Sequence, residues 1–106
     1  MNKGKLKEAL ASNKIEWRKH ALERMLQRNI SRVEVKKVLE FGDIIENYEK
    51  DMPYESALFL YIVGTPIHVV ASFDEDSMMI YVITAYIPDS ENFENDFKTR
   101  REHENN

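Results

Sequence analysis

Three residues at helical spacing could carry out chemistry together. His20, Arg24 and Arg28 are each four positions apart. On a helix they drift by only about 80° around the axis and form one polar face, here called the basic ridge. Guanidinium groups bind phosphate oxygens in bidentate fashion and favour a neutral imidazole beside them, which can act as a general base on a ribose 2′-hydroxyl. The basic ridge therefore predicts a phosphate site rather than a metal site. The alternative is a solvated face paired with nearby glutamates.

Two further side chains are candidates on expected strands. Tyr86, near the end of the last strand, could stack on a base or donate a proton, or could be a half-buried aromatic with its hydroxyl in water. His68 lies between two apolar residues, and such a histidine is more often a packing residue than a catalyst. The basic side chains expected to contact RNA are Arg18, Lys19, Arg32, Lys98 and Arg101. No metal-binding or nucleotide-cofactor motif occurs, so we expect neither a metal nor a cofactor.

Two helices would hold these residues. The first runs from about Arg18 to Gln27, with an apolar stripe made of Ala21, Leu22, Met25 and Leu26. The second begins at Ser31, where Ser31 and Glu34 have the spacing of a capping box, and continues to about Phe41. Gly42 is then expected in the left-handed conformation that commonly ends a helix.

After Gly42 the spacing of apolar residues becomes that of strands. Four strands are expected over residues 44–48, 56–63, 67–73 and 78–87, followed by a short helix over 92–100. Strict alternation in the last strand places Tyr86 on the same face as Ile80 and Val82, opposite Tyr81. The predicted fold is α+β, with two N-terminal helices packed on a four-stranded antiparallel sheet and a short C-terminal helix.

The length of 106 residues fits one domain. We expect residues 1–14 to be an N-terminal extension with at most a helical turn or two. Residues 15–101 would form the single domain, and the wholly polar residues 102–106 a disordered tail.

Composition and charge narrow the class of protein. The chain has no cysteine and no apolar stretch long enough to span a bilayer, which favours the cytoplasm and excludes a disulfide framework. Residues 14–39 carry eight basic against three acidic side chains, whereas residues 40–97 carry one against thirteen. A basic N-terminal third on an acidic body gives the molecule a directional electrostatic field.

Several motifs resemble a known family. They are the block His20-Ala21-x-x-Arg24-Met25-x-x-Arg28, the capped helix that ends in Gly42, Pro53-Tyr54, the strand 66–70, and the run Thr84-Ala85-Tyr86-x-Pro88-Asp89. Together, over about residues 15–101, they resemble an uncharacterised bacterial domain family grouped with the RelE/ParE/BrnT-like toxin superfamily.

The resemblance implies a RelE-like α+β fold and the activity of a toxin that cuts mRNA without a metal ion and is inhibited by a cognate antitoxin protein. It implies that His20, Arg24, Arg28 and Tyr86 are the catalytic positions. RNA would be the substrate and an antitoxin the partner, and no membrane would be involved.

The acidic body of the chain motivates a second hypothesis. A non-catalytic module of the same fold could use a sheet edge or the acidic surface to bind a protein partner. A DNA-binding regulator is less favoured, because no clean helix-turn-helix pairing is present.

Overall fold

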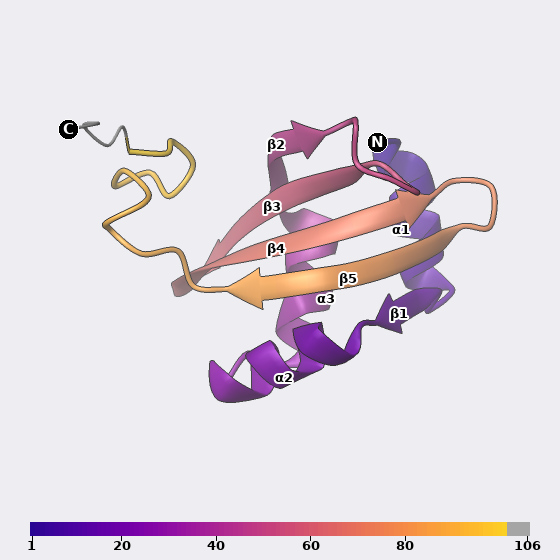
Figure 1. The fold of residues 1–106 in the computed structure, drawn as a ribbon. Helices are drawn as coiled ribbons and strands as arrows, with labels where there is room; N and C mark the ends of the chain where they lie inside the picture. The colour runs from indigo at the N-terminus through magenta and orange to yellow at the C-terminus, as the bar shows by residue number, and fades with distance from the viewer. Residues whose placement is uncertain (102–106) are drawn as a thin grey trace.

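The computed structural model describes residues 1–101, apart from the side chain of Val63, and has an α+β fold (Figure 1). The expected disordered tail, residues 102–106, lies outside the described residues. The elements in chain order are α1 (Lys3–Ala11), β1 (Ile15–Trp17), α2 (Lys19–Gln27), α3 (Arg32–Phe41), β2 (Asp43–Tyr48), β3 (Ser56–Val63), β4 (Thr65–Asp74) and β5 (Met79–Tyr86).

The sheet is mixed and has five strands, in the order β1-β5-β4-β3-β2. The prediction of four antiparallel strands missed β1, which pairs in parallel with β5 over Ile15–Trp17. A strand of three residues is too short to give a clear alternating pattern. It nevertheless pairs with residues 80–82 on the outer side of β5. The four predicted strands themselves are confirmed as an antiparallel series from β2 to β5.

The first fourteen residues are more than an extension with a helical turn or two. They contain the nine-residue helix α1, which Asn2 caps by accepting a hydrogen bond from the backbone N–H of Lys5. Leu6 and Ala9 are each only 1% exposed and belong to the main core. The helix is thus held by tertiary packing, which outweighs the weak local signal of a terminal segment.

The second predicted helix is confirmed as α3, including its capping box. The Ser31 hydroxyl accepts from the Glu34 N–H at 3.1 Å, and the Glu34 carboxylate accepts from the Ser31 N–H at 3.0 Å. The prediction for Gly42 was wrong, because its φ is −76°, not left-handed. Glycine is required there for space: a Cβ would lie 2.4 Å from the Val38 carbonyl oxygen and 2.6 Å from that of Leu60.

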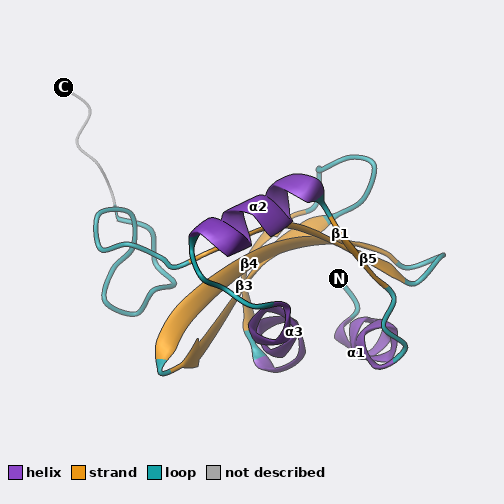
Figure 2. Cartoon of the chain, turned by 90° about the horizontal axis from the view of Figure 1, so that it is seen from below, coloured by secondary structure: helices purple, strands orange, loops and turns teal. Residues whose placement is uncertain are grey.

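The helices and the sheet enclose one core. α1 and α3 lie against one face of the sheet, and α2 runs beside β5 (Figure 2). Ala21 and Met25 of α2 are buried in this core, as predicted. Leu26 is not, since 84% of it is exposed, so the apolar stripe of α2 is narrower than expected. Burial of each large aliphatic side chain in this core contributes about 1.5–3 kcal/mol to the free energy of folding.

A β-bulge changes which residues of β5 share a face. Between β4 and β5 the register shifts, so that Ala71 pairs with Val82 but Val70 pairs with Thr84. The extra residue reverses the alternation beyond it. Tyr81, opposite Ser72, and Tyr86, opposite His68, therefore lie on the same face of the sheet, and Tyr86 lies on the face opposite Ile80 and Val82. The expected placement of the two tyrosines was wrong for this reason.

The C-terminal segment, residues 88–101, forms turns rather than the expected helix over 92–100. The Asp96 carboxylate accepts hydrogen bonds from the backbone N–H groups of Lys98 and Thr99, which hold the pKa of Asp96 down at about 2. Such local bonds compete with the helical pattern. An isolated bridge joins Phe93 to Arg100, and Phe93 is 3% exposed. Burial of that ring and the turn at Asp96 thus replace helix formation.

Candidate functional site

The basic ridge lies on the surface of α2, but its two ends have different surroundings. The His20 side chain is 90% exposed, and its Nδ1 atom lies 3.7 Å from a carboxylate oxygen of Glu23. Arg28 follows the last helical residue and is half-buried. Because a helix rises 1.5 Å per residue, His20 and Arg28 are separated by about 12 Å along the axis. His20 and Arg28 therefore cannot close on the same small group without a large movement.

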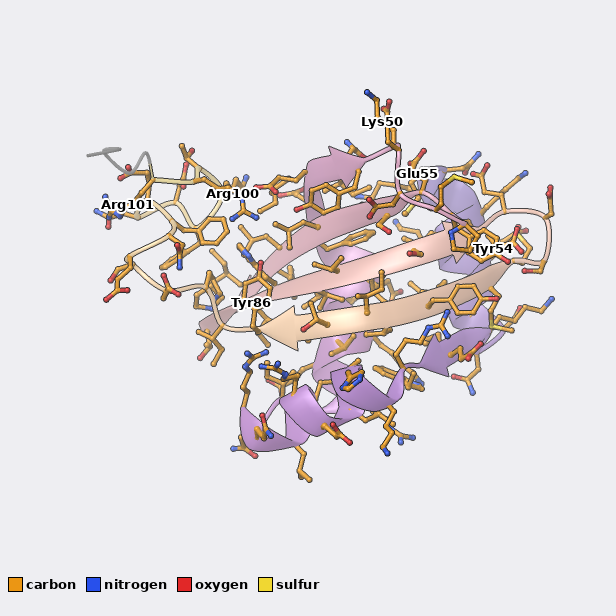
Figure 3. The ribbon with its side chains drawn as sticks, in the orientation of Figure 1. Lys50, Tyr54, Glu55, Tyr86, Arg100 and Arg101 are labelled. Atoms are coloured by element: carbon orange, nitrogen blue, oxygen red, sulfur yellow. The ribbon has the colours of Figure 1, made fainter. Side chains whose placement is uncertain are left out.

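Arg28 connects the ridge to the last strand. Its Nη1 atom donates a hydrogen bond of 3.1 Å to the carbonyl oxygen of Ala85, the residue before Tyr86. Arg24, one turn earlier on α2, is exposed. The structure therefore brings Arg28 next to the end of β5 and keeps Arg24 open to solvent. The labelled Tyr86 lies at that end of the strand (Figure 3).

The imidazole beside Tyr86 is that of His68. The two residues are directly opposite each other on β4 and β5. The Tyr86 hydroxyl lies 3.3 Å from the Nδ1 atom of His68, and the two rings are in edge contact at 5.2 Å. His68 has no exposed surface, whereas Tyr86 is partly exposed. A ligand on the surface would therefore contact Tyr86, with His68 behind it.

The position of the proton on His68 follows from its partners. Its Nε2 atom lies 2.6 Å from the carbonyl oxygen of Phe97. A carbonyl can only accept, so Nε2 carries the hydrogen. Burial lowers the pKa of His68 and outweighs the opposing effects of the Phe97 carbonyl and Glu46, which favours the neutral ring. Nδ1 is then an acceptor, and it receives the hydrogen bond that the Tyr86 hydroxyl donates.

This pair has the arrangement of an activated hydroxyl group. Burial raises the pKa of Tyr86, so the phenol keeps its proton at neutral pH. The base next to it, His68, is held by a third group, the Phe97 carbonyl. A hydroxyl, a base and a group that orients the base are the parts of a proton-transfer chain.

Three residues near this pair were not among the predicted site residues. Arg100 donates to both carboxylate oxygens of Glu46, at 2.7 and 3.1 Å, and Tyr48 donates to the same carboxylate at 2.5 Å. Burial would raise the pKa of Glu46, but the bonds from Arg100 and Tyr48 outweigh it and the pKa is lowered. Glu46 is therefore an ionised carboxylate on the His68 side of the sheet, where its charge would favour a protonated His68.

The sequence held only a partial signal for these residues. Strand alternation places His68 on the face away from the helices, where a polar partner was to be expected. What covers that face depends on the C-terminal segment, and a helix was expected there. Arg100 joins Tyr48 and Glu46 because this segment folds back to β2.

The RNA-binding candidates near α2 are spread along the surface. The Arg18 guanidinium lies over the Tyr81 ring at 4.9 Å, and that of Arg32 over the Trp17 ring at 5.6 Å. Lys19 is exposed at the first position of α2. Arg18 and Lys19 thus lie at the start of α2, whereas Arg32 begins α3 and contacts Trp17 of β1.

The candidates at the C-terminus, in contrast, contact acidic groups of the chain. The Nζ atom of Lys98 lies 3.7 Å from Asp43, and Nη1 of Arg101 lies 2.7 Å from Glu94. The structure joins neither Lys98 nor Arg101 to the basic ridge. Both positive charges are partly balanced within the molecule.

Two general features of the described residues also bear on function. Within residues 1–101, no group of three or more His, Cys, Asp and Glu side chains is placed to hold a metal ion. In the same part of the chain, no helix is both long and apolar enough to span a bilayer.

Comparison with known proteins identifies the family. Residues 17–87 match the family described as a domain of unknown function, DUF4258. Neither a curated protein nor a solved structure matches the chain significantly. The family match begins at the end of β1 and ends one residue after β5, so it contains α2, His68 and Tyr86 but stops before the C-terminal segment. The chain belongs to the DUF4258 family.

Proposed function

We propose that this protein is a metal-independent endoribonuclease that acts on single-stranded RNA. The observation that carries the proposal is the hydrogen-bonded pair of Tyr86 and His68, together with the bond that ties Arg28 of the basic ridge to the residue before Tyr86. Arg24 and Arg28 bind the scissile phosphate, and Tyr86 contacts the ribose. His20 is a further RNA contact, because it lies about 12 Å along the helix from Arg28.

The reaction is a transfer of the phosphoryl group to the neighbouring 2′-oxygen. The 2′-hydroxyl gives its proton to the Tyr86 oxygen while Tyr86 passes its own proton to Nδ1 of His68. The 2′-oxygen bonds to phosphorus, the bond from phosphorus to the 5′-oxygen breaks, and the leaving oxygen takes a proton from water. His68 later returns its proton to solvent through Tyr86. The products are a 2′,3′-cyclic phosphate and a 5′-hydroxyl end.

The positive charges near the site support this assignment. Phosphoryl transfer builds negative charge on the phosphate oxygens, and arginine forks stabilise that charge. The substrate provides the nucleophile, so the step does not require a metal-bound hydroxide. The acidic body of the chain would keep the RNA on the side of the molecule that carries α2.

The proposed activity agrees with the motifs that resemble the RelE/ParE/BrnT-like toxins. In that setting an antitoxin protein would be the natural partner of the chain. We propose this partner together with the activity, since an unregulated ribonuclease would harm the cell that makes it.

The activity is tested with the purified chain, single-stranded RNA and EDTA. We expect cleavage by the wild type and a loss of about 10²-fold or more in Tyr86→Phe, because the phenol oxygen can no longer relay the proton. The matched control is Tyr81→Phe, which removes a hydroxyl from the same face of the same strand. It should keep the wild-type rate. Cleavage at equal rates by wild type and Tyr86→Phe would exclude the proposal.

A second candidate function, a non-catalytic protein-binding module, is favoured by the unpaired outer edge of β2. Strand β2 ends the described sheet, and its outer backbone groups could pair with a strand of a partner. A partner whose strand pairs with β2 should then protect the backbone amides of β2 from hydrogen exchange. Lack of any bound protein after capture from the native host would weigh against this function.

A further inference from the structure

The C-terminal segment lies over the end of the sheet where β4 begins and β5 finishes (Figure 1). It starts after the last residue of the family match. Although it contains no regular helix or strand, it covers the one buried histidine among the described residues.

Two contacts from the segment enclose the His68 ring. The Phe97 carbonyl accepts the hydrogen bond from Nε2 at 2.6 Å. The Phe93 ring packs edge-on against the imidazole, with centroids 4.6 Å apart at 86°. The ring is completely buried by these residues and the sheet. The face of His68 away from Tyr86 is therefore built by this segment.

The backbone at Phe97 indicates that this contact is enforced. Its φ is 59°, in the left-handed region that a bulky residue rarely adopts. Such a conformation persists only where surrounding contacts determine it. Here the turn at Asp96 directly precedes Phe97, and the carbonyl group of Phe97 itself accepts the bond from His68.

Ion pairs anchor the segment to the far strand of the sheet. Arg100 binds Glu46 of β2 through two hydrogen bonds, and Lys98 lies 3.7 Å from Asp43 at the start of the same strand. The guanidinium of Arg100 also lies 4.9 Å from the centre of the Phe93 ring. Arg100 thus links the anchor on β2 to the ring that packs on His68.

We propose that the C-terminal segment, residues 88–101, is a positioning element, in which Phe93 and Arg100 hold His68 so that its Nδ1 lone pair faces Tyr86. The catalytic consequence rests on the proposed function of Tyr86, but the effect on His68 does not. The element lies outside the family match. In this chain, the site would therefore be completed by residues that are not part of the family domain.

The proposal has a definite electrostatic consequence. Groups from three parts of the fold face His68. They are Tyr86 from β5, Glu46 from β2, and Phe93, Phe97 and Arg100 from the C-terminal segment. If the segment is loosened, water reaches the imidazole and the Phe97 carbonyl no longer selects the nitrogen that carries the proton. Both neutral forms of the ring then occur, and the ring accepts a proton more easily.

The test is NMR of the full chain labelled with ¹⁵N in the histidine rings, recorded across a pH series. In the wild type we expect His68 to show one neutral form, with the proton on Nε2. In Arg100→Lys the charge stays but the two-pronged bond to Glu46 is lost. We expect a second neutral form and a pKa of His68 closer to its ordinary value of about 6.5. Phe93→Ala should increase the share of the second neutral form and bring the pKa of His68 still closer to that ordinary value.

The matched control is Lys50→Gln, because Lys50 is an exposed cation on the loop between β2 and β3, outside the C-terminal segment. This variant should leave the ring ¹⁵N spectrum and the pKa of His68 unchanged. In RNA cleavage, Arg100→Lys should lower kcat by about tenfold or more with little change in KM.

Two results would separate the proposals. An unchanged His68 spectrum in both Arg100→Lys and Phe93→Ala would overturn the positioning role. If Phe93→Ala does not fold, Arg100→Lys alone decides the question, since that side chain is at the surface. The expected spectra in a wild type that does not cleave RNA would support the positioning of His68 and overturn the ribonuclease.

Discussion

The hydrogen bond from Arg28 to the carbonyl of Ala85, 3.1 Å long, ties the end of α2 to the residue before Tyr86. Because of this bond, a guanidinium at the end of α2 lies beside the backbone of the last strand, one residue before Tyr86. The pairing of Tyr86 with His68 then connects this surface to a buried base.

The two arginines of the basic ridge should dominate the electrostatic part of RNA binding. We expect Arg24→Gln and Arg28→Gln each to weaken binding and to reduce the slope of log affinity against log salt by about 0.7, the value for one phosphate contact on a single strand. The measurement is fluorescence anisotropy of a labelled single-stranded RNA at several salt concentrations.

Lys50→Gln is the matched control for this experiment. Lys50 is an exposed cation on the loop between β2 and β3, far from α2 (Figure 3). Its replacement changes the net charge by the same amount. An equal reduction in slope for Lys50→Gln would mean that net charge, not the basic ridge, determines binding.

The two histidines should differ in their effect on cleavage. His20 is 90% exposed, whereas His68 is bonded to Tyr86. We expect His20→Gln to change kcat by less than about threefold, and His68→Gln to lower it by about 10²-fold, the usual contribution of a general base. Urea unfolding of His68→Gln confirms that the variant is folded at the assay temperature. A larger effect at His20 than at His68 would reverse the assignment.

The buried His68 should make stability depend on pH. Its folded pKa is lowered by burial, so below about pH 6.5 the unfolded chain binds a proton that the folded chain does not. The free energy of unfolding therefore falls as pH decreases from about 6.5 towards the folded pKa. For one group the slope is at most about 1.4 kcal/mol per pH unit.

Urea unfolding between pH 7.5 and 5 measures this effect. In His68→Gln the slope should be shallower than in the wild type, while His20→Gln should keep the wild-type slope. The difference between the variants removes the contribution of the carboxylates. Equal slopes in the wild type and His68→Gln would show that His68 is not held neutral.

Gly42 should tolerate no side chain. A Cβ there would lie 2.4 and 2.6 Å from two backbone oxygens, and backbone cannot move aside cheaply. We expect Gly42→Ala to lower the free energy of unfolding by about 3 kcal/mol, measured with urea. In the control Gly4→Ala, on helix α1, the nearest atom is the flexible Asn2 side chain at 3.3 Å. That change should be neutral or stabilising by up to about 1 kcal/mol.

Sequence patterns predicted the elements whose signals are local. The capping box at Ser31 and the four antiparallel strands follow from residue spacing within a few positions, and both are confirmed. The helix α1 and the strand β1 were not predicted at full extent. Each is held by distant partners, the core for Leu6 and the edge of β5 for Ile15.

The candidate site could be predicted only in part. The basic ridge was visible from helical spacing, and Tyr86 from its place in the last strand. The bulge in β5 could not be predicted from strand alternation. It moves Tyr86 to the face of the sheet that carries His68. Nor could the fold of the C-terminal segment be predicted, because burial of Phe93 against His68 is a contact between residues 25 positions apart.

The chemical nature of the cleaved ends is the most direct test of the proposed proton transfer from the ribose to Tyr86. Single-stranded RNA is incubated with the wild-type chain in EDTA, and the fragments are examined by mass spectrometry. The proposed mechanism predicts 2′,3′-cyclic phosphate and 5′-hydroxyl ends, and no cleavage of a strand in which every ribose is 2′-deoxy. Absence of cleavage, or equal cutting of the 2′-deoxy strand, would contradict it, because no 2′-hydroxyl would then be giving its proton to Tyr86.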